Sequence, residues 1–210
     1  NNTALIDMYG VGRFGTDQAE GIVLSGWAWN AGAMNNADVY QVNMAILAQK
    51  SDGTLRTATS EMVPSPLTNG AGSVVIADFN GDGKGDLLWR GPNGEVVMWF
   101  MNGATVTGAP NLGTVSLNYT IAAVGDLNGD GKSDIVWRDA AGNVPVWLMN
   151  GAALVNNGAS VGIAPTDWQI VGTGDFNGDG NADILWRGPA GEVAAWLMNG
   201  TTILAGPQIG

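Results

Sequence analysis

Short apolar runs separated by polar, glycine-rich stretches recur along most of the sequence. Examples are VVI at 74–76, LLW at 87–89 and VVMWFM at 96–101, each bounded by Gly, Asp or Asn. Runs of this length, flanked by residues that favour turns, are typical of β-strands rather than of helices. The pattern predicts an all-β fold made of many short strands joined by tight turns.

The strand pattern repeats with a period of about 48 residues. Three closely similar stretches occur: DFNGDGKGDLLWR at 78–90, DLNGDGKSDIVWR at 126–138 and DFNGDGNADILWR at 175–187. In each copy a second Trp follows 21 residues after the first Asp and leads into Met-Asn-Gly. Four short strands per repeat at this period are typical of β-propeller blades, in which small sheets pack face to face.

A degenerate copy of the repeat precedes the three clear ones. Alignment of 12–24 with 125–137 retains Phe14, Asp17 and an apolar strand, but places Arg13 where the first loop Asp belongs. This copy is longer than the others, and the extra residues fall in 26–40. We therefore predict a single repeat domain over 1–210 with four four-stranded blade units, at residues 5–70, 71–118, 119–167 and 168–210.

The acidic stretches have the spacing of a cation-binding loop. Asp or Asn occupies loop positions 1, 3, 5 and 9, and Gly occupies position 6, where it permits a sharp bend. Calcium requires six to eight oxygen ligands, and the residue at position 7 would add its backbone carbonyl. Position 12 is Trp, so the bidentate Glu of a helix–loop–helix site is missing. The predicted ligands are Asp78, Asn80, Asp82, Lys84 and Asp86 in the first loop, Asp126, Asn128, Asp130, Lys132 and Asp134 in the second, and Asp175, Asn177, Asp179, Asn181 and Asp183 in the third.

The alternative role for these Asp and Asn residues is turn capping, which they perform without a metal. Three carboxylates within nine residues repel one another unless a cation is present, and this arrangement occurs three times. We therefore predict three Ca²⁺ sites. Sites of this kind in extracellular modules bind calcium at about 10⁻⁴–10⁻³ M, which predicts a secreted or cell-surface protein.

With this loop and period, the chain resembles the FG-GAP or VCBS repeat, the calcium-bearing blade of integrin α-subunit propellers and of many secreted bacterial proteins. The resemblance is close over Ser73 to Gly210 and more distant over Leu5 to Gly70. It implies a propeller whose faces and loops bind ligands and partners. Such propellers usually have seven blades, so four units could close as a small ring, self-associate with a second copy, or pack against another protein.

Composition narrows the function. Acidic residues outnumber basic ones 19 to 8 and the net charge is −11, which argues against nucleic acid as a partner. No apolar run is long enough to insert into a membrane. The sequence contains no His and no Cys, which excludes catalytic triads built on either residue, and we do not expect an enzyme.

The tryptophans divide into two groups. Those that recur in every repeat could form a sugar-binding platform, but blade-to-blade packing is the role that we predict for them. Trp27, Trp29 and Trp168 fall outside the repeat and are candidates for ligand contact. The leading hypothesis is a non-catalytic extracellular module that recognises a glycan or a protein. The alternatives are a structural subunit of an extracellular assembly and an accessory domain of a larger secreted hydrolase.

Overall fold

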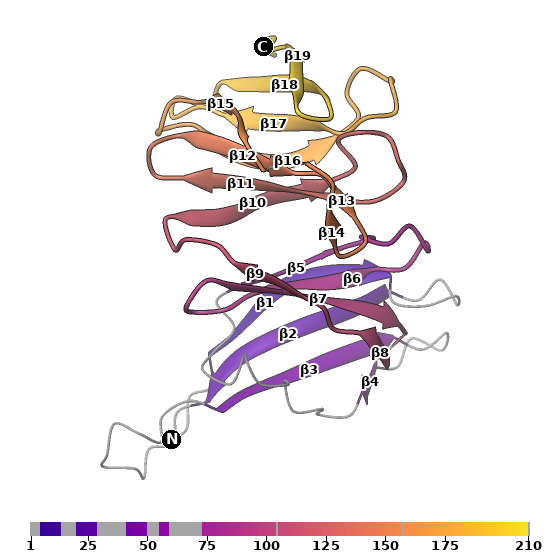
Figure 1. Ribbon diagram of the computed structural model, residues 1–210. Coiled ribbons are helices and arrows are strands. Elements are labelled where there is room, and N and C mark those ends of the chain that lie inside the picture. The colour runs from indigo at the N-terminus through magenta and orange to yellow at the C-terminus, as the bar shows by residue number, and fades with distance from the viewer. Residues whose placement is uncertain are drawn as a thin grey trace. The chain divides into compact units, whose positions relative to one another are not determined.

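The computed structural model describes seven segments of the chain: residues 5–13, 20–28, 41–49, 55–58, 73–103, 105–156 and 158–209. The strands before Ser73, and Ser73 itself, are described by their backbone only. Every named element is a β-strand (Figure 1). No helix in these segments is long and apolar enough to span a bilayer. The prediction of an all-β chain is confirmed.

The chain divides into two compact units, which are described separately. Unit 1 comprises Asn1–Ala77 and Gly83–Val115, and unit 2 comprises Asp78–Asp82 and Ser116–Gly210. The first acidic loop is shared between them, because its first five residues belong to unit 2.

Unit 1 begins with a four-stranded antiparallel sheet in the order β1-β2-β3-β4. Its strands are β1 (Leu5–Arg13), β2 (Glu20–Ala28), β3 (Gln41–Gln49) and β4 (Leu55–Ala58). Gly12 pairs with Gly21 in this sheet, in the register position where Gly125 pairs with Asp134 in unit 2. The pairing therefore agrees with the alignment that made residues 5–70 a copy of the repeat. Most of the predicted insertion, residues 29–40, lies outside the described residues.

The second sheet of unit 1 contains β5 to β9. The strands are β5 (Ser73–Ala77), β6 (Asp86–Arg90), β7 (Glu95–Asn102), β8 (Thr105–Gly108) and β9 (Asn111–Thr114). The order is β5-β6-β7-β8, and β9 also pairs with β7. A cluster that includes Leu87, Trp89, Trp99 and Met101 forms its core. These residues alternate along β6 and β7, so their side chains lie on one face of the sheet.

Unit 2 contains two four-stranded antiparallel sheets. The first is formed by β10 (Tyr119–Gly125), β11 (Asp134–Asp139), β12 (Asn143–Trp147) and β15 (Ser160–Ile163), with a small hairpin of β13 (Met149–Asn150) and β14 (Ala153–Leu154). The second is formed by β16 (Gln169–Gly174), β17 (Asp183–Arg187), β18 (Val193–Asn199) and β19 (Thr202–Ala205).

The two sheets of unit 2 pack face to face (Figure 1). Val136 and Val144 of the first sheet share one buried cluster with Ile184, Trp186 and Met198 of the second. Burial of an aliphatic side chain of this size contributes about 1.5–3 kcal/mol, so this contact is a major source of stability.

A pair of tryptophans recurs in each of the three clear repeats. The ring centroids of Trp89 and Trp99 lie 5.1 Å apart with an interplanar angle of 58°, and the other two pairs have nearly the same geometry. The first Trp of each pair is almost fully buried. The prediction that these residues belong to the core is confirmed for Trp89, Trp137 and Trp186.

Three of the sheets have the four antiparallel strands of a propeller blade, and the sheet of β5 to β9 has a fifth strand, because β9 also pairs with β7. In the part of the chain that the structure describes, they form separate antiparallel sheets, and no closed propeller is shown.

Candidate metal-binding loops

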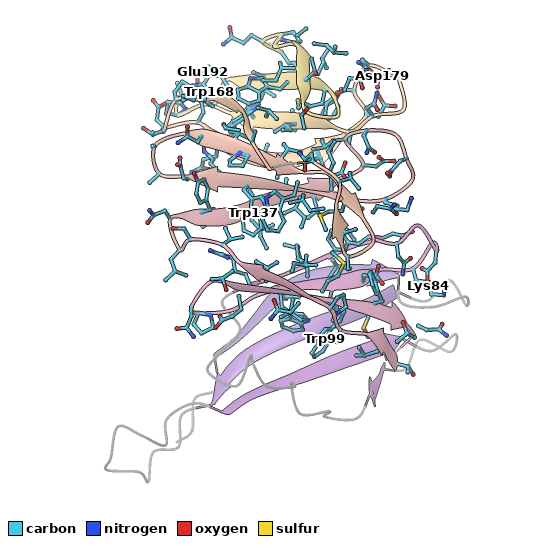
Figure 2. All side chains as sticks on the ribbon, viewed as in Figure 1. Lys84, Trp99, Trp137, Trp168, Asp179 and Glu192 are labelled. Carbon is cyan, nitrogen blue, oxygen red and sulfur yellow. The ribbon has the colours of Figure 1, made fainter. Side chains whose placement is uncertain are left out.

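Each acidic loop connects the first two strands of a sheet. In unit 2, residues 126–133 join β10 to β11, and residues 175–182 join β16 to β17. Figure 2 labels Asp179 in the second of these loops, and Lys84 in the connection between β5 and β6. The residues predicted at positions 1, 3, 5 and 7 therefore share one connection in each repeat, and position 9 begins the next strand.

Two glycines in each loop have backbone angles that other residues rarely adopt. Gly129 and Gly131 have φ values of 71° and 82°, and Gly178 and Gly180 have values of 78° and 88°. These values lie in the left-handed region, where a Cβ atom is unfavourable. The sequence pattern predicted a sharp bend at the glycine of position 6. It did not predict that the glycine of position 4 also adopts a left-handed backbone conformation. The signal was available, because position 4 is Gly in all three copies.

The side chains at positions 1, 3 and 5 turn inward onto the backbone of their own loop. In the loop at 126–133, the carboxylate of Asp126 accepts hydrogen bonds from the N–H groups of Asp130 at 3.1 Å and Gly131 at 2.7 Å. The amide oxygen of Asn128 also accepts the N–H of Asp130, at 3.1 Å. Asp130 in turn accepts the N–H of Lys132 at 2.9 Å.

The loop at 175–182 repeats this arrangement. Asp175 accepts the N–H groups of Gly178, Asp179 and Gly180, at 2.7, 3.2 and 3.0 Å. Asn177 accepts the N–H of Asp179 at 2.9 Å. In the first loop, Asp78 and Asn80 accept equivalent bonds from Gly81 and Asp82. The same set of oxygens is therefore drawn toward the centre of each loop.

The aspartate at position 9 has a structural role that the sequence analysis did not predict. Asp134 is fully buried, and its two carboxylate oxygens accept the N–H groups of Met149 at 2.8 Å and Leu127 at 2.9 Å. Asp183 accepts the N–H groups of Met198 and Phe176 in the same way. This carboxylate ties the start of the acidic loop to the Met-Asn-Gly segment.

The spacing of this tie was present in the sequence. In all three repeats, 15 residues separate the aspartate at position 9 from the methionine that donates to it: Asp86 to Met101, Asp134 to Met149 and Asp183 to Met198. The constant spacing of this Asp and Met could have indicated, from the sequence alone, that the Asp side chain bonds to the Met backbone.

In the second loop, the negative charge of Asp134 is unfavourable in its buried surroundings. The pKa of Asp134 is raised to about 7, chiefly by burial and in addition by the negative charges of Asp130 and Asp126, and its two N–H bonds offset part of the rise. In contrast, hydrogen bonds from the backbone of Asn181 and the side chain of Asn177 lower the pKa of Asp179. The second loop therefore combines a buried acid with two nearby carboxylates.

Successive loops of unit 2 touch one another. A Cβ atom placed on Gly129 would lie 3.1 Å from the amide oxygen of Asn181, and one on Gly81 would lie 3.4 Å from Cγ of Lys132. The side chain at position 7 therefore reaches position 4 of the preceding loop. The predicted metal contact of position 7 is through its carbonyl, which leaves the side chain available for this packing.

Comparison with known families identifies this repeat. The FG-GAP-like repeat model matches three segments, residues 5–89, 78–137 and 126–186. The chain belongs to the FG-GAP-like repeat family. The first match includes the degenerate copy, and the second and third each run from one acidic loop to the buried Trp after the next. No curated protein matches this FG-GAP-like chain.

The carboxylate and amide oxygens of the FG-GAP-like loops are of the type that hard cations prefer as ligands. Each carboxylate oxygen has two lone pairs, and the hydrogen bonds described above occupy only part of this capacity. Among the described residues, no group of three or more His, Cys, Asp or Glu side chains is arranged to hold a metal ion. A cation in these loops would therefore also need the amide oxygen at position 3 and the carbonyl at position 7.

The predicted ligand-contacting tryptophans occupy different elements. Trp27 lies in β2 and pairs with Leu5 and Val42, whereas Trp29 lies outside the described residues. Trp168 is half-buried against the core of unit 2. Figure 2 shows it at the opposite end of the last blade from Asp179. A role of these residues in ligand contact stays a prediction.

Proposed function

We propose that this FG-GAP-like chain is a non-catalytic calcium-binding protein of the cell exterior, whose blades recognise a glycan or protein ligand. The observation that carries the calcium proposal is the repeated inward turn of Asp, Asn and Asp side chains in the loops. This arrangement recurs in 126–133 and 175–182 with nearly the same hydrogen bonds.

Electrostatics supports a divalent cation in the second loop. Asp126, Asp130 and Asp134 place three carboxylates around one connection, and the raised pKa of Asp134 reflects the cost of their proximity and of burial. Calcium would neutralise this charge and take oxygen ligands from positions 1, 3, 5, 7 and 9. The backbone N–H bonds would hold the side chains ready for it.

The expected stabilisation follows from mass action. At about 1 mM free calcium and a Kd of about 10⁻⁴ M, each site contributes about 1.4 kcal/mol to the free energy of unfolding. Three sites would contribute about 4 kcal/mol, a large part of the stability of a typical domain. The proposed role of calcium is therefore structural.

Calorimetric titration with CaCl₂ tests this proposal. We expect three calcium ions per chain, a higher melting temperature with calcium than with EDTA, and little effect of magnesium, which prefers a smaller octahedral site. Asp126→Asn combined with Asp130→Asn should reduce the stoichiometry to two. Asp167→Asn, at an exposed acid outside the loops, is the matched control and should leave it at three. Absence of binding heat and of any calcium-dependent shift in melting would disprove the calcium proposal.

The non-catalytic part of the proposal is supported by the absence of His and Cys from the sequence and by the placement of nine of the 19 acidic residues in the loops. Recognition is tested separately, by saturable binding to glycan and protein arrays. Trp27→Ala or Trp29→Ala should abolish a specific signal. A chain that binds nothing on a broad array would favour the structural-subunit alternative.

A further inference from the structure

A backbone hydrogen bond joins the second acidic loop, at 126–133, to the third, at 175–182. The carbonyl of Asp126, at loop position 1, accepts the N–H of Ala182, at loop position 8, at 2.6 Å. This N–H belongs to the same peptide group as the carbonyl of Asn181, which is the predicted calcium ligand at position 7 of the third loop. Because a peptide group is planar and rigid, its oxygen and its N–H cannot be placed independently. The ligand geometry of the third loop is therefore tied to the second loop.

A second peptide group continues this connection into the predicted ligands of the second loop. The peptide group between Asp126 and Leu127 contains both the carbonyl that accepts from Ala182 and the N–H of Leu127. That N–H donates to the carboxylate of Asp134 at 2.9 Å, and Asp134 is fully buried at loop position 9. The two peptide groups, 181–182 and 126–127, are called the peptide relay. They connect the position 7 carbonyl of the third loop to the position 9 carboxylate of the second.

Both hydrogen bonds of the peptide relay occur more than once in unit 2. One step earlier, the carbonyl of Asp78 at position 1 accepts the N–H of Ser133 at position 8, at 2.7 Å. Within the third loop, the N–H of Phe176 donates to the carboxylate of Asp183 at 2.9 Å, as that of Leu127 does to Asp134. The connection is therefore a property of the repeat.

A cation at one end of the peptide relay would act on the other end. Hydrogen-bonded groups in a chain polarise one another, so a cation at the carbonyl of Asn181 makes the N–H of Ala182 a stronger donor, and the N–H of Leu127 after it. The strengthened bonds hold Asp126 and Asp134 more firmly in place. A loop that is already ordered loses less conformational freedom when it binds its own ion, which gives positive cooperativity.

We propose that calcium binding to the second loop and calcium binding to the third loop are positively coupled through the peptide relay. This inference rests on the calcium binding proposed above and adds that the two sites are not independent. Repulsion between the two ions opposes the coupling. Each loop supplies three carboxylates, however, and their negative charge exceeds the charge of one Ca²⁺. The repulsion is therefore neutralised within each loop.

Calcium titration of the full chain, followed by NMR, tests this coupling site by site. Asp175→Asn combined with Asp179→Asn disables the third loop, and the N–H signal of Leu127 reports occupation of the second. We expect the calcium concentration that half-saturates the second loop to rise by about fivefold or more. Asp126→Asn combined with Asp130→Asn should weaken the third loop by the same factor, because coupling between two binding sites is reciprocal.

Two controls separate the peptide relay from general electrostatics. The variant with Asp175→Asn and Asp179→Asn keeps one carboxylate in its third loop, at Asp183. This loop has the same net charge from carboxylates and metal as an unmodified third loop with one Ca²⁺ bound. The variant therefore reproduces the electrostatic field of the occupied loop but not the ordering of the relay. Asp167→Asn, at an exposed acid outside the loops, should leave both half-saturation concentrations unchanged.

The relay itself is observed when the second loop is disabled by Asp126→Asn and Asp130→Asn. Calcium binding to the third loop should still move the amide protons of Ala182 and Leu127 downfield, because both relay bonds strengthen. The N–H of Trp168 is the reference, since Figure 2 shows this residue at the opposite end of the last blade from Asp179, and it should not shift.

The possible outcomes distinguish the coupling from calcium binding itself. A second loop that binds calcium equally well with the third loop intact or disabled would overturn the coupling and leave the calcium proposal standing. The same holds if calcium in the third loop leaves the Leu127 amide proton unshifted. An unmodified chain with no calcium-dependent change in its NMR spectrum or melting temperature would overturn both proposals. Circular dichroism in EDTA should show that all variants fold.

Discussion

Arg138 and Arg187 occupy the same position in two repeats but have different surroundings, and this difference predicts different effects of one substitution. Arg138 donates to the carbonyl of Pro165 at 2.7 Å and to that of Trp168 at 3.2 Å, and its guanidinium lies over the Trp186 ring. Arg187 is exposed. Replacement by Met keeps most of the aliphatic stem and removes the charged group in both cases.

The magnitude follows from the contacts of Arg138. Each of its two short hydrogen bonds involves a charged donor, and partial exposure reduces the contribution of each to about 1 kcal/mol. The contact with the Trp186 ring adds about 1 kcal/mol. We expect Arg138→Met to lower the free energy of unfolding by about 2–4 kcal/mol, and Arg187→Met to change it by less than about 0.5 kcal/mol.

Urea denaturation with saturating calcium, followed by tryptophan fluorescence, measures both values. An unchanged slope of the transition with a lower midpoint would identify a true loss of stability. Equal effects of the two substitutions would refute the reasoning, because they would show that the contact with the next blade contributes nothing.

Three further predictions concern the loops and their aspartates. Asp134→Ala leaves two buried N–H groups without an acceptor, and it also removes a buried charge, which offsets part of the loss. In EDTA it should lower the free energy of unfolding by about 1–4 kcal/mol. An unchanged free energy of unfolding in urea denaturation would contradict this prediction. Leu127→Ala should cost about 2–5 kcal/mol and Phe176→Ala about 1 kcal/mol or less, since only the first is covered by a blade; thermal melting would reject the assignment if their order were reversed. Gly129→Ala places a Cβ in a left-handed position beside Asn181 and should cost about 1–2 kcal/mol, and an unchanged urea midpoint would show that the loop relaxes freely.

Much of the fold could be predicted because the repeat fixes both strand periodicity and loop chemistry. The spacing of Trp137 and Trp147 on adjacent apolar runs was enough to assign them to a blade, and the structure brings the two rings together at 5.1 Å. The acidic loops were also visible, because Asp, Asn and Gly stand at fixed positions. Local sequence determines these features, so a single sequence reveals them.

Contacts between blades could not be read in the same way. The bond from Ala182 to the carbonyl of Asp126 involves only backbone atoms and therefore leaves no residue preference at either position. Trp168 fell outside the repeat, so its sequence position gave no sign that its carbonyl accepts from Arg138 or that its ring packs against the core. Both features depend on how blades are stacked.

The tie between loop position 9 and the methionine also limits where the repeat can change in length. The three tied intervals, such as Asp134 to Met149, all span 15 residues. The one-residue difference between the two repeat periods instead falls after the methionine, with 25 residues from Met101 to Asp126 and 26 from Met149 to Asp175. In the degenerate copy, Gly21 stands where the other repeats have the aspartate of position 9. The extra residues at 26–40 follow Gly21, in the part of the repeat whose length the aspartate–methionine bond keeps constant in the other copies. Loss of one carboxylate thus removes a constraint on insertion, and the degenerate unit is the place in this chain where a long segment has been accommodated.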